Sequence, residues 1–341
     1  MKKIRLELPG GGYDILIGRG LLSEADKYFN LNRRVLILTD SGVPSEYAEA
    51  VGSLCSASKI VTVECGEGSK SLEVYGRVLS EMVAFGMTRS DCCVAVGGGV
   101  VGDLCGFVAA SYMRGIDFYN IPTTVLSQVD SSIGGKVAVN LSGLKNLVGA
   151  FYQPKGVIID PNVLKTLPKR QIANGLAESV KMALTSDSEL FSLFEREKIS
   201  EENIDEVIFR SLMIKKTVVE ADERECGLRK ILNFGHTFGH AVEAECEMAG
   251  YYHGECVAIG MTVACSESVR KRLIPVLEGL GLPTVWHGDT KRALDFIKHD
   301  KKCDGDMLSA VFVEEVGKYV IKKMSVSDFC GTVEERLRAL N

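Results

Sequence analysis

The stretch Cys93–Phe107, CVAVGGGVVGDLCGF, indicates the fold, because a continuous apolar segment runs into three glycines and then into a helical pattern. An uninterrupted apolar run is typical of a strand buried on both faces of a parallel sheet. Glycines at the following turn let the backbone approach a pyrophosphate, which the positive end of a helix stabilises. A tight turn without a ligand would use the same residues, and GGGxxGD differs from the common dinucleotide pattern GxGxxG. The stretch therefore predicts a strand–turn–helix unit and leaves its ligand open.

Neighbouring segments repeat this alternation of apolar strands and helical patterns. RVLILT at 34–39 is followed by a helical stretch at 45–51, and KIVTV at 59–63 is followed by a helical stretch near 70–85. Further strands are expected at 4–8, 13–18, 117–122 and 156–160, the first two as an opening pair. Repeated units of strand, crossover and strand predict an α/β protein with a doubly wound parallel sheet of the Rossmann type.

The pattern changes after residue 163. Apolar positions recur at helical spacing over 165–219 and again over 233–270, where only 250–254 interrupts them. The segment 310–321 is compatible with short strands. The length of 341 residues suits two domains better than one. We therefore expect a Rossmann-like domain at 1–163 and a mostly helical domain at 164–341.

Composition and charge exclude several kinds of partner. Hydrophobic residues make up 46% of the chain, and the formal net charge of -5 argues against a protein that coats nucleic acid or anionic membrane. The N-terminal MKKIRLELPGGGYDILIG lacks the pattern of a signal peptide, and no apolar stretch is long enough to span a bilayer. The 11 cysteines include no Cys-x-x-Cys pair, so we expect them to be reduced, as in a cytoplasmic protein.

Polar side chains follow the expected strands, at the end of a parallel sheet where ligands bind. Asp40 ends the strand at 34–39, and Glu67 and Lys70 follow the strand at 59–63. An acid in such a place can bind ribose hydroxyls, and lysine beside glycine-rich backbone suits a phosphate or carboxylate. A solvated loop without a ligand is the alternative. After 117–122 comes a belt of hydroxyl, amide and charged side chains: Thr123, Thr124, Gln128, Asp130, Ser131, Ser132, Lys136, Lys145 and Asn146.

Three of the 5 histidines lie close together in the sequence. His236 and His240 are four residues apart in NFGHTFGHAVE, so on a helix they share one face. His253 follows a glycine-containing break where the chain can fold back, and GLAESVK supplies the carboxylate of Glu178. Histidines with one carboxylate and an open position describe a catalytic divalent metal site rather than a closed structural site, although any one of these histidines alone is compatible with a purely structural role.

Basic residues accompany this set. Lys181 follows Glu178 by three residues, and the segment before the histidines contains Lys215, Arg229, Glu225 and Asn233. Basic groups beside a metal suggest an anionic substrate whose hydroxyls the metal binds.

Taken together, these segments resemble the 3-dehydroquinate synthase family, the shikimate-pathway members of the sugar-phosphate cyclases. The resemblance implies an NAD-binding Rossmann-like domain, a helical metal-binding domain and an active site in the cleft between them. Cys256 stands where alanine is common, and Cys226 lies beside Glu225; these departures remove no functional group but raise the prospect of oxidative sensitivity. The matching motifs stand in family order from about Asp40 to Lys302: GGGVVGDLCGFVAASYMRG, IPTTVLSQVDSSIGGKVAVN, GLKNLVGAF, GLAESVK, ADERECGLRKILNFGHTFGHAVEAE, HGECVAIGM and DKK.

The resemblance also implies roles for single residues. Glu178, His236 and His253 match the ligands of one divalent metal, zinc or cobalt, and His240 matches a neighbouring histidine that contacts the substrate. Arg114 matches an arginine that reaches the phosphate of the neighbouring subunit's substrate, which implies a homodimer. Substrate-binding or catalytic positions match Asp130, Lys136, Asn146, Lys181, Lys215, Glu225, Arg229, Asn233 and, of the last lysine pair, Lys302. NAD contacts match Asp40, Glu67, Lys70, Gly98, Gly99, Asp103, Thr123, Thr124, Lys136, Lys145 and Thr166.

The reaction implied by the resemblance converts 3-deoxy-D-arabino-heptulosonate 7-phosphate into 3-dehydroquinate and phosphate. NAD+ removes a hydride from C5, phosphate leaves by β-elimination, NADH returns the hydride, and an aldol step closes the ring.

Three other functions are alternatives to this interpretation. The first is an NAD- and metal-dependent polyol or glycerol-phosphate dehydrogenase, which needs no crowd of basic groups such as Lys136 and Lys181. The second is a sister cyclase whose substrate lacks the carboxylate that Lys215 and Arg229 would bind. The third, a non-catalytic NAD-binding regulator, has no need of the metal residues.

Overall fold

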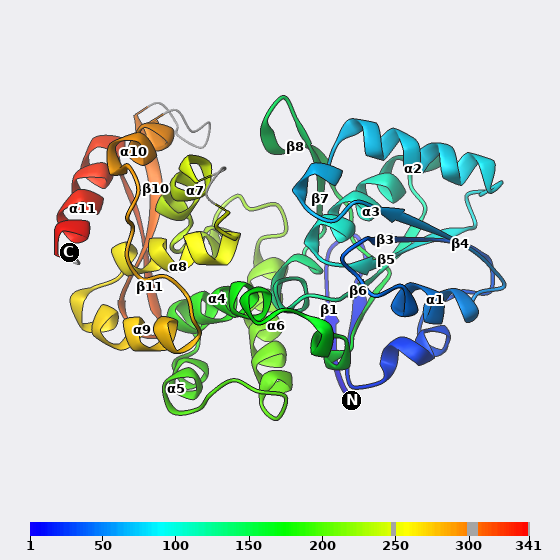
Figure 1. The fold of residues 1–341 in the computed structure, drawn as a ribbon, viewed down its shortest axis with the longest axis horizontal. Coiled ribbons are helices and arrows are strands. Elements are labelled where there is room, and N and C mark those ends of the chain that lie inside the picture. The colour runs from blue at the N-terminus through cyan, green and yellow to red at the C-terminus, as the bar shows by residue number, and fades with distance from the viewer. Residues whose placement is uncertain (247–249, 299–305, 340–341) are drawn as a thin grey trace. The chain divides into compact units, whose positions relative to one another are not determined.

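The structure is a computed structural model of the chain, and it describes residues 1–246, 250–298 and 306–339. The chain divides into two compact units, Met1–Pro168 and Lys169–Asn341, called unit 1 and unit 2 here. Their division falls close to the boundary that the sequence predicts at residue 163. Figure 1 labels the helices and strands of both units.

Unit 1 is built on a seven-stranded sheet with the order β1-β2-β9-β6-β5-β3-β4. All neighbouring strands in it are parallel except β1 and β2, which form the expected antiparallel pair. The predicted doubly wound parallel sheet is therefore confirmed. Its strands are β1 (Lys2–Leu6), β2 (Tyr13–Ile17), β3 (Arg34–Asp40), β4 (Ala57–Val63), β5 (Cys92–Gly97), β6 (Asp117–Pro122) and β9 (Gly156–Ile159).

Helices cover both faces of this sheet, because alternate residues of its buried strands point to opposite sides. In β5, Cys93 packs with the residues of α2 and α3, whereas Cys92 packs with those of α1 and the 3-10 helix η1. All ten described cysteines of the chain are free, as the sequence predicts. The helices of unit 1 are η1 (Leu21–Lys27), α1 (Ser45–Ser53), η2 (Glu67–Ser69), α2 (Leu72–Ala84), α3 (Gly99–Ser111), η3 (Tyr112–Arg114) and η5 (Pro161–Thr166).

The polar belt after β6 forms a π-helical turn, η4 (Ser127–Ser131), and then a hairpin of β7 (Lys136–Leu141) and β8 (Leu144–Phe151). This hairpin is a separate two-stranded sheet, and Val137 and Val139 anchor it in the core beside α3. Sequence reasoning did not predict these strands, because only Val137 and Val139 of β7 are buried and β8 is almost entirely exposed.

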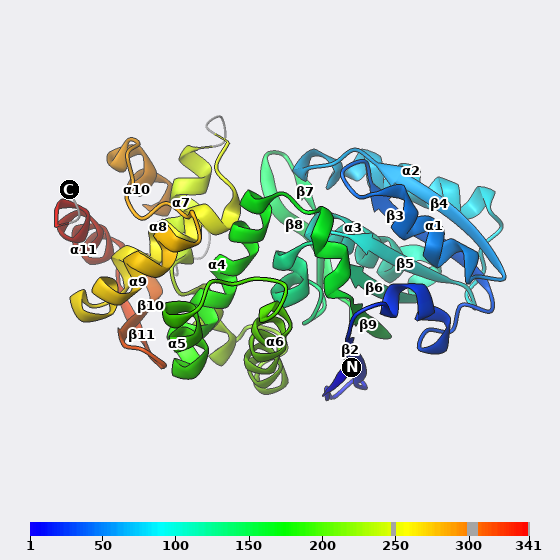
Figure 2. The same ribbon diagram turned by 60° about the horizontal axis from the view of Figure 1, so that its bottom comes forward.

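Unit 2 is mostly helical, as predicted, and Figure 2 shows α4 beside α5 and α6. The segment 310–321 forms two antiparallel strands. The helical pattern of 233–270 is broken at Cys265 as well, because this residue bridges to Val313 in β10. The elements of unit 2 are α4 (Lys169–Ser186), α5 (Ser188–Arg196), α6 (Ile204–Ala221), η6 (Leu228–Asn233), α7 (His236–Glu245), α8 (His253–Ala264), α9 (Glu267–Gly279), α10 (Thr290–Lys298), β10 (Met307–Glu315), β11 (Lys318–Ser325) and α11 (Val326–Arg338).

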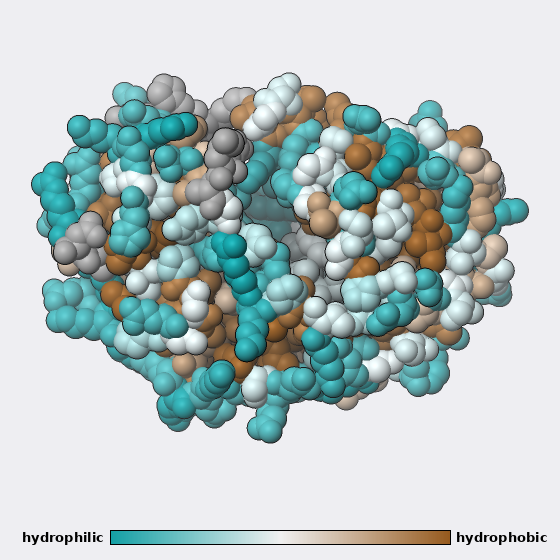
Figure 3. All heavy atoms as spheres, viewed as in Figure 1, coloured by the Kyte–Doolittle hydropathy of each residue, from teal (hydrophilic) through white to brown (hydrophobic). Residues whose placement is uncertain are grey.

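The surface is largely polar on the face shown in Figure 3, where hydrophobic residues form separate patches among hydrophilic ones. Within the described residues, no helix combines the length and the apolar character that crossing a membrane requires.

Candidate active site

Three imidazole rings come together in unit 2. His236 begins α7 and His240 follows one turn later, with their ring centroids 5.1 Å apart. His253 begins α8, and its ring centroid lies 5.2 Å from that of His236 and 5.8 Å from that of His240. One ligand atom of each ring lies within 4.8 Å of the others, close enough for a single metal ion to contact all three. The structure thus brings together the three histidines that the sequence singled out.

Glu178 supplies a carboxylate to this cluster from the middle of α4, where its side chain is fully buried. Its Oε1 lies 3.6 Å from Nε2 of His236 and 3.4 Å from Nε2 of His253, and the ammonium group of Lys181 contacts Oε2. Neither oxygen accepts a hydrogen bond of normal geometry from the described residues. Because a buried carboxylate is destabilising without compensating partners, its place between two imidazole nitrogens fits a bound cation.

Two of the rings are held by their second nitrogen. Nδ1 of His236 lies 3.1 Å from the carbonyl oxygen of Phe234, and Nδ1 of His253 lies 3.2 Å from Oε2 of Glu243. A carbonyl or carboxylate that accepts the Nδ1 proton leaves Nε2 unprotonated and directed at its ligand, which is the usual arrangement of metal-binding histidines. In both rings this Nε2 is the atom that faces Glu178.

The charges of the cluster shift its pKa values in opposite directions. Burial raises the pKa of Glu178, but Lys181 and the imidazoles outweigh it and hold that pKa well below its usual range. Burial and the charge of Lys181 keep the pKa of His236 well below its usual range. Burial lowers the pKa of His253, but the carboxylates of Glu178 and Glu243 prevail and raise it to about 9. Without a metal, the ammonium group of Lys181 and a proton on His253 supply positive charge beside the carboxylates of Glu178 and Glu243.

Glycines let α4, α7 and α8 approach closely enough to form this cluster. A Cβ atom on Gly260 would overlap the carbonyl oxygen of Gly235, and one on Gly254 would overlap that of Asn174. A Cβ atom on Gly239 would lie 2.9 Å from the carbonyl oxygen of Cys256. The spacing of the helices that carry His236, His240, His253 and Glu178 is thus set by contact between backbones.

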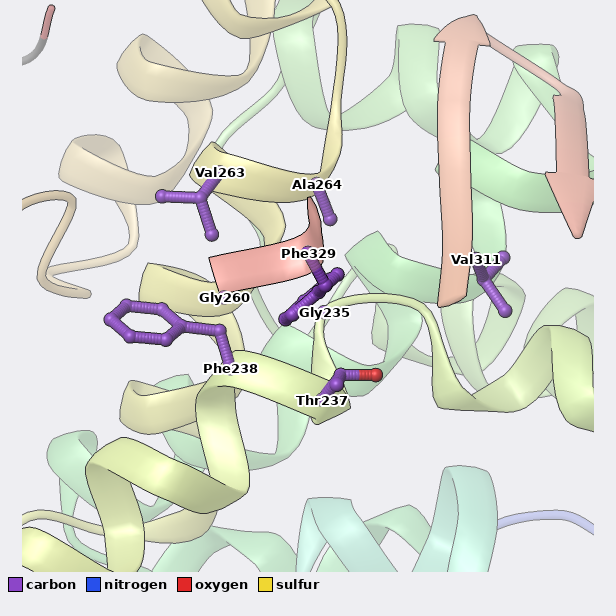
Figure 4. A pocket seen from close by; sticks show the side chains of 8 residues that line it. All are labelled: Gly235, Thr237, Phe238, Gly260, Val263, Ala264, Val311 and Phe329. Atoms are coloured by element: carbon purple, nitrogen blue, oxygen red, sulfur yellow. The ribbon is translucent and has the colours of Figure 1, made fainter. Parts of the chain in front are cut away.

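A small cavity borders the same helix contact, between residues of α7, α8, β10 and α11 (Figure 4). Its volume is about 10 Å³, enough for one water molecule. The side chains in Figure 4 are apolar except for Thr237. A cavity of this size and lining is a packing gap and not a substrate site.

Three cationic side chains among the predicted site residues of unit 2 are buried: Lys181, Lys215 and Arg229 are 1%, 4% and 3% exposed. Lys215 lies on α6 and Arg229 on η6, and both elements pack against α4. Nη1 of Arg229 donates to the carbonyl oxygen of Glu223 at 2.5 Å. Buried cationic side chains suit the binding of an anionic group, and Lys181 contacts Glu178 of the histidine cluster, so this set is compatible with an anionic ligand.

Two further predicted residues are Glu225, in the loop between α6 and η6, and Asn233, at the end of η6. Nδ2 of Asn233 donates to Oε1 of Glu225 at 2.9 Å, and Glu225 has a φ of 61°. Asp222 holds this loop, since its carboxylate accepts from the amides of Cys226, Gly227 and Arg229. Non-glycine residues with positive φ are uncommon and often mark functional loops.

In unit 1, the glycine loop joins β5 to α3. A Cβ atom on Gly98 would lie 3.1 Å from Cγ2 of Thr124, and one on Gly99 would lie 3.0 Å from Oγ of Ser131. The hydroxyls of Ser131 and Ser132 are buried and make no hydrogen bond with the described residues. The first amides of α3 have no acceptor within the helix. The glycine loop leaves room for a ligand in front of these amides and hydroxyls, which can donate hydrogen bonds. This arrangement fits the pyrophosphate of a dinucleotide.

Lys70 contacts three other predicted residues of unit 1. Its side chain is 4% exposed, and its ammonium group donates to Oδ2 of Asp103 at 2.6 Å and to Oδ1 of Asn146. Oε1 of Glu67 lies 3.7 Å away and accepts a hydrogen bond from Nδ2 of Asn140 at 2.8 Å. The loop after β4, the start of α3 and the hairpin therefore share one polar network.

Most of the other candidate NAD contacts lie at the ends of strands or of a 3-10 helix and form hydrogen bonds with residues of unit 1. Oδ1 of Asp40, at the end of β3, accepts from the amide of Gly42 at 2.8 Å. The amide of Thr123 donates to Gly97, and the hydroxyl of Thr124 lies 2.8 Å from that of Ser127. The hydroxyl of Thr166, at the end of η5, lies 3.2 Å from that of Tyr47. Two candidate lysines, Lys136 and Lys145, are exposed, and Asp130 is half-buried.

Arg114 lies in a backbone turn of unusual conformation. It is exposed, and both it and Met113 have positive φ, 69° and 48°. No carboxylate of the described residues pairs with it. Lys302, the last predicted site residue, lies outside the described residues.

Two residues at the candidate site were missed by sequence reasoning. Glu243, which contacts His253, stands one helical turn after His240, and a carboxylate at that spacing was a usable signal. Asn140, which joins the network of Lys70, accepts from the amide of Asn146 at 2.8 Å. No sequence signal pointed to it, because it ends a strand that was not predicted.

Comparison with known proteins identifies the fold and the family. The chain is 27% identical to 2-deoxy-scyllo-inosose synthase, solved with carbaglucose-6-phosphate, NAD+ and Co2+; the match covers 98% of this chain and 100% of that one, with a TM-score of 0.86. It is also 27% identical to 2-epi-5-epi-valiolone synthase from Streptomyces hygroscopicus, solved with NAD+ and Zn2+, over 96% and 97% of the chains, with a TM-score of 0.87. A probable glycerol dehydrogenase from Sinorhizobium meliloti, at 17% identity and a TM-score of 0.62, shares the fold alone, over 95% and 96% of the chains.

The fold and its histidine–carboxylate cluster thus define a protein of the sugar-phosphate cyclase class. Residues 60–174 match the model of the 3-dehydroquinate synthase N-terminal domain, and residues 175–303 match that of the C-terminal domain. The chain is 40% identical to the 3-dehydroquinate synthase of Clostridium beijerinckii over 96% of its length and 100% of the relative. It is 42% identical to that of Streptococcus pneumoniae, over 96% of its length and 98% of the relative. The chain belongs to the 3-dehydroquinate synthase family.

Proposed function

We propose that this chain catalyses the reaction for which its family is named, the conversion of 3-deoxy-D-arabino-heptulosonate 7-phosphate into 3-dehydroquinate and phosphate. The observation that carries the proposal is the cluster of Glu178, His236 and His253 with buried cations beside it. Such a cluster suits a substrate that carries hydroxyls for a metal and anionic groups for lysine and arginine. The family relationship supports the same reaction.

Glu178, His236 and His253 are the proposed ligands of one divalent metal, Zn2+ or Co2+, because Oε1 and the two Nε2 atoms face one another. His240 is the proposed substrate contact beside them, within reach for proton transfer. The proposed NAD site is the glycine loop with the strand-end residues of unit 1. The solved cyclases that this chain resembles hold NAD+ with Co2+ or Zn2+, which supports both cofactors.

Held by the glycine loop, NAD+ would supply reversible hydride transfer, and a metal held by Glu178, His236 and His253 would supply a Lewis acid. The protein's own groups bind and orient. Lys181, Lys215 and Arg229 supply the positive charge that a carboxylate and a phosphate require, inside a protein of net charge -5. Because these side chains are buried, their charges act with little screening by solvent. The same groups disfavour the polyol dehydrogenase, whose substrate is neutral.

An assay that follows phosphate and absorbance at 340 nm together tests this function. We expect many equivalents of phosphate for each NAD+ supplied, with no lasting NADH and with loss of activity in EDTA. NADH that accumulates without phosphate release would move the chain to the dehydrogenases. Turnover of glucose 6-phosphate or a heptulose phosphate in place of the keto-acid substrate would make it a sister cyclase.

A homodimer in the cytoplasm is the proposed working form. Arg114 is exposed in a turn with positive φ and has no acidic partner among the described residues, as expected of a group that acts on another subunit. Apolar side chains of the hairpin, Leu144, Leu147 and Phe151, are 43%, 48% and 46% exposed and are candidates for the contact. The ten free cysteines agree with a reducing compartment.

Mixing two inactive variants tests the shared site. If Arg114 serves the partner's substrate, Arg114→Ala and His236→Ala subunits should regain activity when they reassemble together. In such a hybrid one site has both residues intact. Activity that stays absent in hybrids shown to have formed would place Arg114 in its own subunit's site.

A further inference from the structure

Three residues along one face of helix α4 contact the first turn of α8, which begins with the proposed metal ligand His253. Arg170, Asn174 and Glu178 are spaced at i, i+4 and i+8, so they lie one above the other on the helix. Glu178 faces His253, the first residue of α8. The two residues before it on this face contact the backbone or side chains on either side of His253.

Arg170 contacts the chain before and after His253. Its Nε and Nη2 donate to the two carboxylate oxygens of Glu255 at 2.6 Å and 2.7 Å, and Nη2 also donates to the carbonyl oxygen of Gly250 at 2.6 Å. Its guanidinium lies 4.4 Å from the ring centroid of Tyr252. Glu255 in turn accepts a hydrogen bond from the amide of Tyr252 at 2.8 Å. One arginine thus fixes the turn that delivers His253.

Asn174 contacts the residue directly after His253. Its Oδ1 accepts a hydrogen bond from the amide of Gly254 at 2.6 Å, and its side chain is 5% exposed. A Cβ atom on Gly254 would overlap the carbonyl oxygen of Asn174, so the two backbones touch. The first turn of α8 is therefore docked on α4 one helical turn before Glu178.

We propose that Arg170 and Asn174 are positioning residues that set His253 at binding distance from a metal held by Glu178. They act through Glu255 and through the amide of Gly254, and neither touches the imidazole. The inference rests on the proposed function only in taking His253 and Glu178 as metal ligands. Residues that orient a ligand in this way change metal affinity by about 10- to 100-fold when they are replaced.

The ion pair of Arg170 contributes little to stability by itself, because the arginine side chain is 54% exposed. Glu255 is 8% exposed, so removing Arg170 leaves a buried carboxylate without its partner and frees the turn. The expected consequence is local: a displaced His253 and a weakened metal site in a folded protein.

The chain offers a matched control in the pair of Arg272 and Glu195. Both nitrogens of that fork lie 2.7 Å from the carboxylate, the guanidinium lies 5.3 Å from the ring centroid of Phe191, and Arg272 is 47% exposed. Arg272 has the same chemistry as Arg170 and a similar exposure, but it contacts α5 and not the beginning of α8. Its partner Glu195 is 26% exposed, against 8% for Glu255, so Arg170→Gln and Arg272→Gln lose the same kind of forked ion pair in different places and at different depths.

The experiment titrates Co2+ into the full-length, metal-free protein and follows the visible absorption of the ion, together with thermal unfolding without metal. We expect Arg170→Gln to weaken Co2+ binding about tenfold and to alter the absorption bands, whereas Arg272→Gln stays within about twofold of the wild type. Arg170→Gln should be the less stable of the two variants, because Glu255 is more buried than Glu195, but both should remain folded without metal. Wild-type affinity and bands in Arg170→Gln would overturn the inference.

Two further variants keep the test decisive if Arg170→Gln does not fold. Arg170→Lys keeps the charge and the aliphatic stem but not the fork, so it should still bind Co2+ more weakly than the wild type. Asn174→Leu removes the oxygen that accepts from the amide of Gly254, whereas Asn174→Asp keeps an acceptor oxygen at the same place. Only Asn174→Leu should weaken Co2+ binding. If Arg170→Lys and Asn174→Leu both bind Co2+ as the wild type does, the proposed positioning role is wrong. If the wild type itself binds no Co2+, the metal site of the proposed function fails instead.

Discussion

Unit 1 and unit 2 hold their candidate site residues in opposite ways. In unit 1 the candidates follow the ends of parallel strands, many are exposed or half-buried, and the glycine loop offers backbone amides. In unit 2 they lie on packed helices, and Glu178, Lys181, Lys215 and Arg229 are nearly or fully buried. Charges on helices need each other, or a metal, to be stable in the interior, whereas strand ends present polar groups to solvent at little cost. We therefore expect substitutions in unit 2 to have the larger effects.

The largest effect is expected from Glu178→Gln, which removes the one carboxylate of the proposed ligand set. We expect metal affinity to fall by more than about 100-fold and turnover by about 1000-fold or more, because a neutral amide is a poor ligand. Metal content after dialysis and the phosphate assay measure both. His240→Asn is the control: it should keep its metal while turnover falls about 100-fold or more. A variant His240→Asn without metal would support a three-histidine site.

Gly260→Ala should destabilise unit 2, because its Cβ would overlap the carbonyl oxygen of Gly235. Separating α7 from α8 is expected to cost about 2–4 kcal/mol of unfolding free energy. The matched change in unit 1 is Gly76→Ala in α2, where a Cβ atom would meet nothing within 4 Å. That variant should gain about 0.5–1 kcal/mol. Chemical denaturation measures both, and equal losses would remove the difference between the two units.

Lys70→Met should affect unit 1 and leave the metal in place. The change leaves Asp103 without its ion pair and separates the hairpin from the loop after β4. We expect NAD+ to bind about tenfold more weakly, as for loss of one charged hydrogen bond, with unchanged metal content. Calorimetric titration of NAD+ and metal analysis provide the two readings. Loss of metal in this variant would show that the two sets of residues are not independent.

Asp187→Ala should lower the stability of unit 2 and leave the candidate site unchanged, because Asp187 is not among the site residues. Asp187 caps α5 through the amides of Glu189 and Leu190 and pairs with Arg210. Although burial raises its pKa, Arg210 and these amides outweigh that and hold the pKa below its usual value of 3.8.

Its contribution is therefore fully present above pH 4 and is lost as the pH falls through the lowered pKa. We expect the variant to lose about 1–2 kcal/mol at pH 7 and to approach the wild type in acid. Denaturant titrations across pH measure the difference; a gap that widens in acid would contradict this account.

The parts of the fold that could be predicted are those in which sequence pattern and burial coincide. The strand Cys92–Gly97 is wholly buried and its apolar run is continuous, so its place in a parallel sheet was evident. The hairpin of β7 and β8 could not be predicted, because β8 is exposed along nearly its whole length and only two side chains of β7 are buried. Exposed strands carry little hydrophobic signal.

The candidate site shows the same limit. His236 and His240 were found because helical spacing places them on one face, and Glu178 because GLAESVK supplies the carboxylate that a catalytic metal site requires. Glu243, Asn140, Arg170 and Asn174 were not found, since each acts on a residue brought near by packing rather than by spacing. The groups that can touch a ligand are visible in sequence, whereas those that hold them in place become visible only in three dimensions.

The stripe on α4 also limits how the length of this helix can change. Arg170, Asn174 and Glu178 share a face only while the helix between them is uninterrupted. A single inserted residue would rotate everything after it by about 100° and advance it by about 1.5 Å. Glu178 would then point away from His253 while Arg170 still held Glu255. The register of α4 is therefore less tolerant of insertions and deletions than of substitutions, and among relatives the interval from the arginine to the glutamate should be constant where the intervening residues are not.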